Sequence, residues 1–282
     1  MSPERNEMKD AAQAAILQAL GQAARRPLVI GLCGAQGSGK STLAAALAAS
    51  LNGADIVTAV LSLDDLYLTR AERERQGADV HPLLRTRGVP GTHDVALGLG
   101  IFSALDQGCA ALLPRFDKAS DDRTAETAWG VAPAGTQVLI FEGWCVGARP
   151  EPETALVNPA NVLERLEDPN AVWRHFVNAA LAGPYQTLFA RIDLLIFLAA
   201  PDFDSVARWR AEQELELSAR SLPGAAGIMS EAALARFIQH YERLTRHILA
   251  TMPHDAALTI VLDTSRAARC LQRRDCLSPA DN

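Results

Sequence analysis

Apolar runs and amphipathic stretches alternate along most of the chain. Short runs rich in Val, Leu and Ile predict strands near residues 28–33, 56–62, 137–142, 193–199 and 258–262. Between them, the helical spacing of apolar residues predicts helices at 8–24, 41–51, 94–107, 171–190, 202–219 and 230–250. Runs such as VLIF and LLIFLA are apolar throughout, which is typical of strands covered on both faces. The pattern therefore predicts a three-layer α/β fold with a mostly parallel central sheet flanked by helices.

Chain length and loop composition are consistent with one domain. The 282 residues lie near the upper end of what one α/β domain holds, so we interpret 1–282 as a single domain. Residues 1–27 are expected to form an N-terminal helical extension, and 264–282 a C-terminal tail without a usable motif. The segments 78–92 and 143–160 are rich in Pro and Gly, and we interpret them as long functional loops rather than domain boundaries.

Composition narrows the class of protein. Hydrophobic residues make up 49% of the chain, but no apolar run approaches the roughly 20 residues that cross a bilayer, and the N-terminus MSPERNEMKD is too polar for a secretory signal. A net charge of -6 without a basic stripe argues against nucleic-acid binding. Five scattered cysteines suggest reduced thiols, although Cys270 and Cys276 could pair or bind a metal. We therefore expect a cytoplasmic enzyme without a membrane or nucleic-acid partner, and the sequence does not predict its oligomeric state.

The stretch GAQGSGKST, residues 34–42, has the spacing of a phosphate-binding loop between a predicted strand and a predicted helix. Its glycines let backbone amides approach phosphate oxygens, and the helix that follows directs its positive dipole end at them. Lys40 can reach the outer phosphates, and the Ser41 hydroxyl can bind magnesium. The alternative is a glycine-rich turn with a chance lysine. The loop residues expected to bind ATP are Gly34, Ala35, Gln36, Gly37, Ser38, Gly39, Lys40, Ser41 and Thr42.

Carboxylates follow two further predicted strands. Asp64 and Asp65 in SLDDLYLT emerge at the sheet edge where the phosphate loop lies, and a carboxylate there can accept a proton from an attacking hydroxyl or help to hold magnesium. The alternative is a helix cap before RAERERQ. Glu142 in VLIFEGWCVG ends another strand, where it can organise a metal ion and its waters, or simply open a loop.

Two loop stretches, RTRGVPGTHD and PRFDKASDDR, bring cations together with a few polar side chains. Taken one by one, these residues are compatible with solvated loop charges. Taken as a cluster, they could clamp a small anionic acceptor. The two stretches contribute Arg85, Arg87, His93, Asp94, Arg115, Lys118 and Arg123.

Arg208 and Arg210 in SVARWRAEQE lie on a predicted helix after the fourth strand, where they could close over the transferred phosphate. The alternative is an exposed helix face, with Arg210 paired to Glu214 at helical spacing. The helix that contains IQHYERLTRHIL is interpreted as structural, so that His240 and His247 need no ligand role.

Together, the stretches GAQGSGKST, SLDDLYLT, RGVPGTHD, PRFDKASDDR, FEGWCVG and WRAEQE resemble the D-glycerate 3-kinase family, within the phosphoribulokinase and uridine kinase group of P-loop kinases. The resemblance runs in order from about Leu28 to His247. It implies a P-loop NTPase fold and transfer of a phosphate from ATP, with Mg²⁺, to D-glycerate, which gives 3-phosphoglycerate and ADP. Leu66 departs from the pattern, because relatives often carry an aromatic residue at this place.

The resemblance also implies roles for individual residues. Asp64 corresponds to the general base, Glu142 to the carboxylate near magnesium, and Asp94 to a ligand of the acceptor hydroxyl. Arg123 matches the arginine that ends the acceptor-loop motif, and the implied catalytic set is Asp64, Lys40 and Arg123. Arg208 and Arg210 join the ATP site, and Ser41 and Glu142 form the metal site. The residues expected to bind the acceptor are Asp65, Tyr67, Arg87, His93, Asp94, Lys118 and Arg123.

Other functions remain open from the residues alone, which support phosphoryl transfer to a small hydroxyl compound. The acceptor could be a pantothenate-like acid or a nucleoside. A nucleoside needs a stacking surface, and the loops from 78 to 123 offer only Phe102 and Phe116. A nucleotide-dependent switch or metallochaperone GTPase is a different class, but the guanine-reading sequence Asn-Lys-x-Asp is absent.

Overall fold

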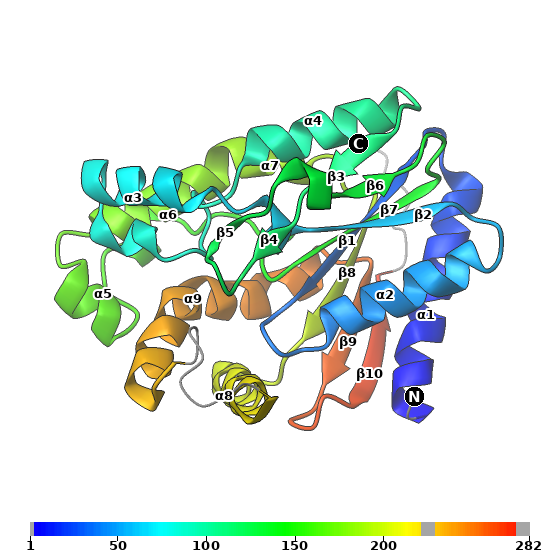
Figure 1. The fold of residues 1–282 in the computed structure, drawn as a ribbon. Helices are drawn as coiled ribbons and strands as arrows, with labels where there is room; N and C mark the ends of the chain where they lie inside the picture. Colours follow the sequence, from blue (N-terminus) through cyan, green and yellow to red (C-terminus); the bar gives the residue numbers. More distant parts are fainter. Residues whose placement is uncertain (1–2, 221–228, 275–282) are drawn as a thin grey trace, which may run out of the picture.

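A six-stranded sheet runs through the centre of the molecule, in the order β10-β9-β8-β1-β7-β2 (Figure 1). The computed structural model describes residues 3–220 and 229–274. Five of the strands are parallel and match the five predicted strands, whereas the edge strand β10 is antiparallel to β9. The strand bounds are Leu28–Gly34 for β1, Thr58–Ser62 for β2, Val138–Gly143 for β7, Leu194–Ala199 for β8, Leu258–Leu262 for β9 and Ala268–Arg273 for β10.

Each predicted helix is present, with ends shifted by a few residues. The segment predicted at 171–190 consists of α6 and α7, joined by a π-helical turn at Leu181–Tyr185 that contains Pro184. The structure adds two shorter helices, α3 and α5. The helix bounds are Pro3–Gln22 for α1, Lys40–Asn52 for α2, Arg70–Asp79 for α3, Val95–Asp106 for α4, Val162–Glu167 for α5, Val172–Ala180 for α6, Gln186–Phe189 for α7, Phe203–Arg220 for α8 and Glu231–Thr251 for α9.

Helices cover both faces of the sheet, as the uninterrupted apolar strands predict. Leu28, Ile30 and Leu32 of β1 are buried in one cluster with α1, α2 and α8. Val29 and Cys33, which alternate with them, are buried in a second cluster with α4 and α7. In Figure 1, α4 and α7 run along one side of the sheet, and α1, α2 and α8 lie on the other. The three-layer α/β fold is therefore confirmed.

The structure corrects the sequence interpretation of two segments. The expected tail 264–282 contains β10, which pairs with β9 over its whole length. The loop region after α4 holds two small antiparallel pairs, β3 (Ala111–Leu113) with β6 (Gly130–Ala132), and β4 (Phe116–Asp117) with β5 (Asp122–Arg123). These strands have only two or three residues each, which is too short for an alternating pattern to be recognised.

The sheet topology gathers the candidate residues at one edge. Strands β1, β7 and β2 are adjacent and parallel, so their carboxyl ends meet. Glu142 pairs with Leu32 on one side and with Ser62 on the other. The loop after β1, the turn after β2 and the end of β7 therefore converge on the same space.

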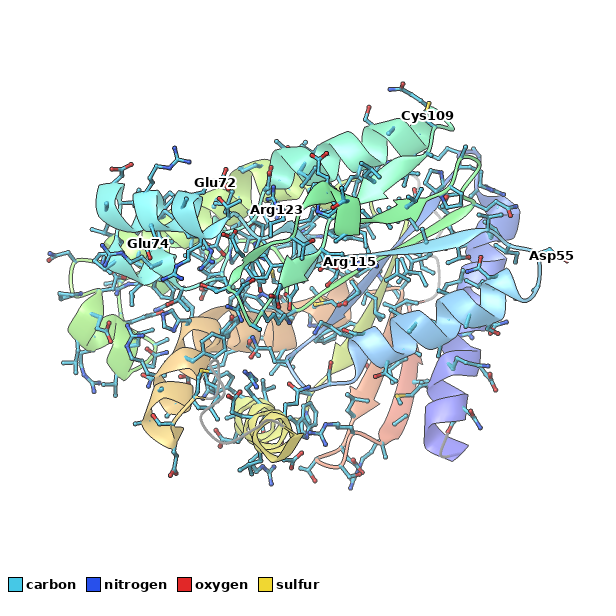
Figure 2. The ribbon with its side chains drawn as sticks, viewed as in Figure 1. Asp55, Glu72, Glu74, Cys109, Arg115 and Arg123 are labelled. Atoms are coloured by element: carbon cyan, nitrogen blue, oxygen red, sulfur yellow. The ribbon has the colours of Figure 1, made fainter. Side chains whose placement is uncertain are left out.

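The cysteines are free and scattered in the described part of the chain. Cys33 and Cys145 are buried, while Cys109 and Cys270 are exposed, and Figure 2 places Cys109 at the outer end of α4, far from Arg115 and Arg123. Cys276, the suggested partner of Cys270, lies outside the described residues. Within residues 3–220 and 229–274, no helix combines the length and apolar character that crossing a membrane requires.

Candidate active site

The predicted phosphate loop has the backbone that its glycines allow. Gly37 and Gly39 adopt left-handed conformations, with φ of 78° and 89°, and Gly39 is the N-cap of α2. A side chain at Gly37 has no room, because its Cβ would lie 2.6 Å from the Cβ of Trp209. The loop thus presents the N-terminus of α2, with its unpaired amides and positive dipole end, to the adjoining pocket.

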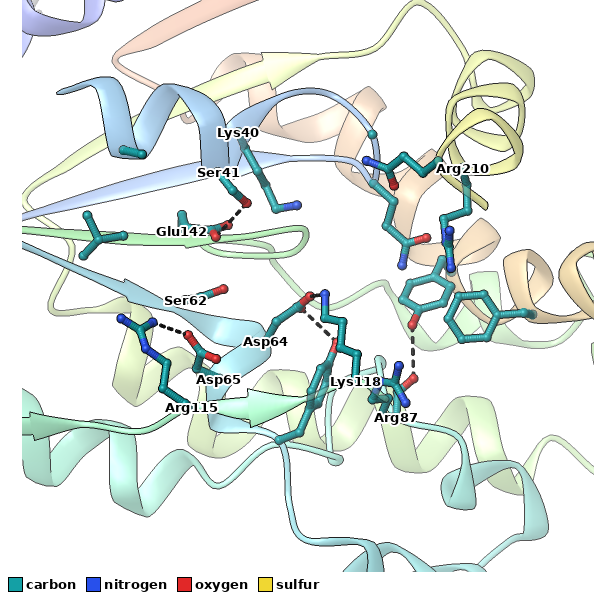
Figure 3. A pocket seen from close by; sticks show the side chains of 18 residues that line it. Lys40, Ser41, Ser62, Asp64, Asp65, Arg87, Arg115, Lys118, Glu142 and Arg210 are labelled. Carbon is teal, nitrogen blue, oxygen red and sulfur yellow. Dashed lines mark hydrogen bonds and ion pairs between the residues drawn. The ribbon is translucent and has the colours of Figure 1, made fainter. Parts of the chain in front are cut away.

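This pocket lies between the phosphate loop on one side and the turn after β2 on the other (Figure 3). Apolar and aromatic side chains form part of its wall, but ionisable groups dominate the side that faces the loop. The ionisable residues that line it are Lys40, Asp64, Asp65, Tyr67, Arg87, Arg115, Lys118, Glu142, Arg210 and Tyr241.

Ser41 and Glu142, the predicted metal site, are in direct contact. The Ser41 hydroxyl donates a hydrogen bond of 2.9 Å to Glu142 Oε1, and Figure 3 shows the pair beside Lys40. Glu142 is buried, and its other oxygen, Oε2, has no hydrogen-bond partner among the described residues. A hydroxyl beside an unsatisfied buried carboxylate oxygen is the donor set that magnesium and its bound waters require, so these residues fit the ion.

Asp64 has a donor on each carboxylate oxygen. Lys118 Nζ lies 2.7 Å from Oδ2, and the Tyr67 hydroxyl donates to Oδ1 at 2.9 Å. Burial alone would raise the pKa of Asp64, but the charges of Lys118 and Lys40 and the two hydrogen bonds together hold the pKa well below its usual range. Asp64 is therefore ionised, and it faces the phosphate loop from the opposite wall of the pocket.

Asp65 also lines the pocket but has different partners. It accepts hydrogen bonds from Arg115 at 2.9 Å and from the backbone N–H of Phe116 at 3.0 Å. Both aspartates stand on a short 3-10 turn, Leu63–Leu66, and this turn lets consecutive side chains reach the same pocket. The alternative role as a cap of α3 belongs instead to Thr69, which forms a capping box with Glu72.

Three of the predicted loop cations line the pocket with Asp64. Arg87 and Lys118 both line it, and Arg87 also forms an ion pair with Asp121 and lies 5.5 Å above the ring of Phe116. Arg85 points to another partner, because its guanidinium is paired at 3.4 Å with Glu74 of α3. Arg115, the third of these cations, lies in the pocket wall and is paired with Asp65 at 2.9 Å.

Three residues predicted to touch the acceptor lie behind Tyr67 instead. The His93 ring stacks on Tyr67 at 4.5 Å, its Nδ1 is 2.6 Å from the Tyr185 hydroxyl, and burial lowers the pKa of His93 to about 3. Asp94 caps α4 and pairs at 3.2 Å with Arg123, which donates to the Tyr67 carbonyl at 2.9 Å. The lining of the pocket, within the described chain, includes Tyr67 but none of these three. In the folded chain these three residues pack behind Tyr67 and hold it in place.

The two arginines of α8 differ in position. Arg210 lines the pocket, and it also forms the ion pair with Glu214, at 2.8 Å, that its helical spacing suggested. Arg208 donates to the Ser205 hydroxyl on its own helix at 3.1 Å, and the pocket wall formed by the described residues does not include it. Of these two arginines, only Arg210 therefore lines the pocket.

Sequence reasoning missed the contribution of α9. Tyr241 and Phe237 line the pocket, and the Tyr241 hydroxyl donates to the Arg87 carbonyl at 3.1 Å. Burial raises the pKa of Tyr241. The regular apolar spacing of this helix gave no signal of a functional face, because core and pocket residues have the same period. His240 on the same helix is buried and bonded to backbone carbonyls of the preceding turn, consistent with its structural interpretation.

Comparison with known proteins finds relatives that are named as kinases. The model of the phosphoribulokinase / uridine kinase family matches residues 29–148. The chain is 36% identical over 258 residues to the protein named Uncharacterized kinase mug58 of Schizosaccharomyces pombe, with 86% of this chain and 90% of that protein covered. It is 30% identical over 258 residues to the chloroplastic D-glycerate 3-kinase of Arabidopsis thaliana; 85% of this chain is covered but only 53% of that protein, so the match spans about half of its length.

A solved structure has the same fold over nearly the whole chain. The D-glycerate 3-kinase from Cryptococcus neoformans var. grubii superposes with a TM-score of 0.78, at 24% identity, and the match covers 95% of this chain and 99% of that one. At this level of identity the likeness establishes the fold.

Proposed function

The chain belongs to the phosphoribulokinase / uridine kinase family of P-loop kinases and has D-glycerate 3-kinase homologues, and from this premise we propose that it transfers a phosphate from ATP to a hydroxyl of D-glycerate. The observation that carries the proposal is a set of cations around Asp64, across the pocket from the phosphate loop: Arg87, Arg115 and Lys118. In a small acceptor that bears a carboxylate beside its hydroxyl, the hydroxyl could contact Asp64 as the base while the carboxylate pairs with one of these cations.

ATP would place its phosphates against the loop amides and the N-terminus of α2. Lys40 and Arg210 would neutralise charge on the transferred group, and Ser41 and Glu142 would hold Mg²⁺ and its waters. Bound Mg²⁺ would withdraw charge from the phosphate oxygens. The wall formed by the phosphate loop would thus bind the nucleotide, and the opposite wall would bind the acceptor.

Asp64 would act as the general base. The acceptor hydroxyl gives its proton to the Asp64 carboxylate, its oxygen forms a bond to the γ-phosphorus, and the bond from that phosphorus to the bridging oxygen breaks to release ADP. For this, the acceptor hydroxyl must replace one of the two donors on Asp64. Lys118 is the more mobile of them, because its side chain is 61% exposed while Tyr67 is buried. The displaced Lys118 ammonium would then form an ion pair with the carboxylate of the acceptor.

His93, Asp94 and Arg123 would act through Tyr67 rather than by touching the acceptor. They support its ring from behind and its backbone carbonyl, so the Tyr67 hydroxyl is fixed on Asp64. Loss of any of them should misplace the base. In this respect the proposal departs from the roles that the family resemblance implies for Asp94 and Arg123.

The proposal is tested by ADP release across a panel of acceptors that share a hydroxyl and differ in charge. D-glycerate, L-glycerate, glycerol, pantothenate and uridine would each be supplied with ATP and Mg²⁺. We expect D-glycerate to give the highest kcat/KM and glycerol to be poor, because glycerol lacks the carboxylate. Lys40→Ala is the control for contaminating kinases, and its turnover should fall by about 10²-fold or more. A preference for glycerol or uridine over D-glycerate would refute the acid-acceptor assignment.

One observation favours a nucleoside as the second candidate acceptor. The sequence argument against nucleosides rested on few aromatic residues in the loops, but Tyr67, Phe237 and Tyr241 also line the pocket. Such rings can stack on a base. Uridine in the panel addresses this alternative directly.

We also propose that the protein acts in the cytoplasm, because the free cysteines of the described residues favour a reducing environment.

A further inference from the structure

The turn between β9 and β10 touches the phosphate loop and α8 at the same time. Arg266 in this turn donates from Nε to the carbonyl oxygen of Gly37 at 2.7 Å, and its other arm forms an ion pair with Glu212 of α8. Its guanidinium also lies 5.3 Å from the centre of the Trp209 ring. One side chain from the C-terminal hairpin thus bridges two elements that border the nucleotide side of the pocket.

The turn is built to hold Arg266 in place. Asp263 accepts hydrogen bonds from the Ser265 amide and hydroxyl and from the Ala267 amide, at 2.7 to 3.0 Å. Arg266 itself has φ of 70°, in the left-handed region that a side chain rarely adopts. A non-glycine residue kept in this region costs free energy, and it persists only where the surroundings determine it. Here the surroundings are the loop carbonyl, Glu212 and the Trp209 ring.

The contact between the loop and α8 is close even without Arg266. Trp209 is fully buried, its Nε1 donates to the Thr264 carbonyl at 2.8 Å, and its Cβ occupies the space that a side chain at Gly37 would need. Arg210, the next residue along the chain, lines the pocket. The hairpin turn, the phosphate loop and α8 therefore meet at a single joint, and the placement of Arg210 depends on it.

We propose that Arg266 is a positioning residue for nucleotide binding, which fixes the phosphate loop and α8 relative to each other. A peptide unit is planar, so anchoring the Gly37 carbonyl also fixes the Ser38 amide of the same unit, which donates to the Ala35 carbonyl at 3.2 Å and so closes the turn of the loop. The ion pair with Glu212 holds α8 at the distance that brings Arg210 over the same phosphates. The contacts of Arg266 lie on the nucleotide side, whereas Asp64 and Lys118 stand on the opposite wall.

This asymmetry gives the test. In Arg266→Ala we expect the Kd for Mg-ADP and the KM for ATP to rise about 10-fold or more, because a charge-assisted bond to the loop is lost. The KM for the acceptor should stay within about two-fold. Arg266→Lys keeps the charge but places its donors on a single nitrogen in place of the planar fork, so it should recover only part of the affinity. Arg273→Ala, an exposed arginine at the far end of β10, is the matched control and should bind Mg-ADP as the unchanged protein does.

A second variant separates positioning from folding. Glu212→Gln leaves the Arg266 bond to Gly37 in place but releases α8, so it should lower kcat more than it weakens Mg-ADP binding. Combined with Arg266→Ala it should add little, because both act at one joint. The proposal is overturned if Arg266→Ala binds Mg-ADP with unchanged affinity, or if Arg266→Lys and Arg266→Ala lose the same affinity. Mg-ADP binding needs no acceptor, so failure of the D-glycerate assignment leaves this test intact.

Discussion

Asp64 and Asp65 are neighbours in the chain but have separate partners in the pocket. Asp64 is held by Lys118 and Tyr67, and Asp65 by Arg115 and the Phe116 amide. Asp64→Asn keeps the size of the side chain but cannot take a proton, so we expect kcat to fall about 10²- to 10⁴-fold with ATP affinity almost unchanged. Steady-state kinetics with a separate measurement of nucleotide binding checks this.

Asp65→Asn is the matched comparison for this prediction. It removes the charge that holds Arg115, so we expect a smaller fall in kcat and a larger change in the KM of the acceptor or in stability. If Asp65→Asn were inactive and Asp64→Asn nearly normal, the base would have been assigned to the wrong residue.

The Lys118 side chain sets the pH range over which Asp64 is ionised. Because the pKa of Asp64 lies well below its usual range, the carboxylate is charged at neutral and moderately acidic pH. Its contribution to stability is fully present above the ordinary pKa of an aspartate and is lost as pH falls from there through the lowered pKa. Lys118→Met removes a nearby positive charge, and burial then raises the pKa. We expect the acid limb of the kcat/KM profile to move up by about one to three pH units.

Lys118→Arg tests the cause of this shift. It keeps the charge beside Asp64, so its acid limb should stay close to that of the unchanged protein even if turnover falls. An acid limb in Lys118→Met at the same pH as in the unchanged protein would show that Lys118 does not control the ionisation of Asp64.

At the scale of elements, one buried arginine joins α3 to the loops that carry the acceptor side of the pocket. Arg73 is fully buried, and its guanidinium donates to the carbonyls of Arg85 at 2.7 Å and Asp121 at 2.6 Å. It also pairs with the Asp121 carboxylate at 3.0 Å. Arg73→Ala leaves these acceptors unsatisfied, so we expect the free energy of unfolding in urea to fall by about 3 to 5 kcal/mol.

Arg75→Ala is the control, since Arg75 is exposed on the same helix and its loss should change stability by no more than about 0.5 kcal/mol. The β4–β5 pair carries Lys118 in its turn and is held by Arg73 through Asp121. Arg73→Lys should recover little, because an ammonium cannot serve carbonyls in several directions. If Arg73→Ala and Arg75→Ala had the same free energy of unfolding, the contacts of Arg73 would not stabilise the fold.

Elements that bury a continuous apolar surface could be predicted from the sequence. The five parallel strands and the long helices belong to this group, because their period reflects burial. Strand β10 has an exposed face and contains Arg269, Gln272 and Arg273, so its pattern resembles a polar tail. It becomes a strand only because β9 offers an unpaired edge, and this information lies in the tertiary structure.

The candidate site was predictable to the extent that strand ends position it. Lys40 and Asp64 follow two of three adjacent parallel strands, and Glu142 lies near the carboxyl end of the third, so their meeting follows from sheet topology. His93 and Arg123 have the same polar character in the sequence, but packing places them behind Tyr67. Contacts that come from distant segments, such as those of Tyr241 and Arg266, have no local signal and required the folded structure.

At the scale of the whole molecule, nucleotide binding should stabilise the fold. The phosphate loop touches α2, α8 and the C-terminal hairpin, so ligand bound there links elements from both ends of the chain. With Mg-ATP at about 100 times its Kd, the added stability is about 2.7 kcal/mol, which corresponds to a rise in Tm on the order of 5 to 10 °C. Differential scanning fluorimetry measures this. Lys40→Ala should lose most of the rise, and an equal rise in that variant would contradict the assigned phosphate contact.

The uneven distribution of charge has a consequence for how ligands arrive. The pocket wall carries the cations Lys40, Arg87, Arg115, Lys118 and Arg210 against the carboxylates Asp64, Asp65 and Glu142, while the chain as a whole has a net charge of -6. Because cations outnumber carboxylates in this wall, an anionic ligand is attracted near the mouth of the pocket, within one Debye length of about 8 Å at physiological ionic strength. Diffusion thus delivers anions selectively to this opening, and added salt slows their capture before it affects any chemical step.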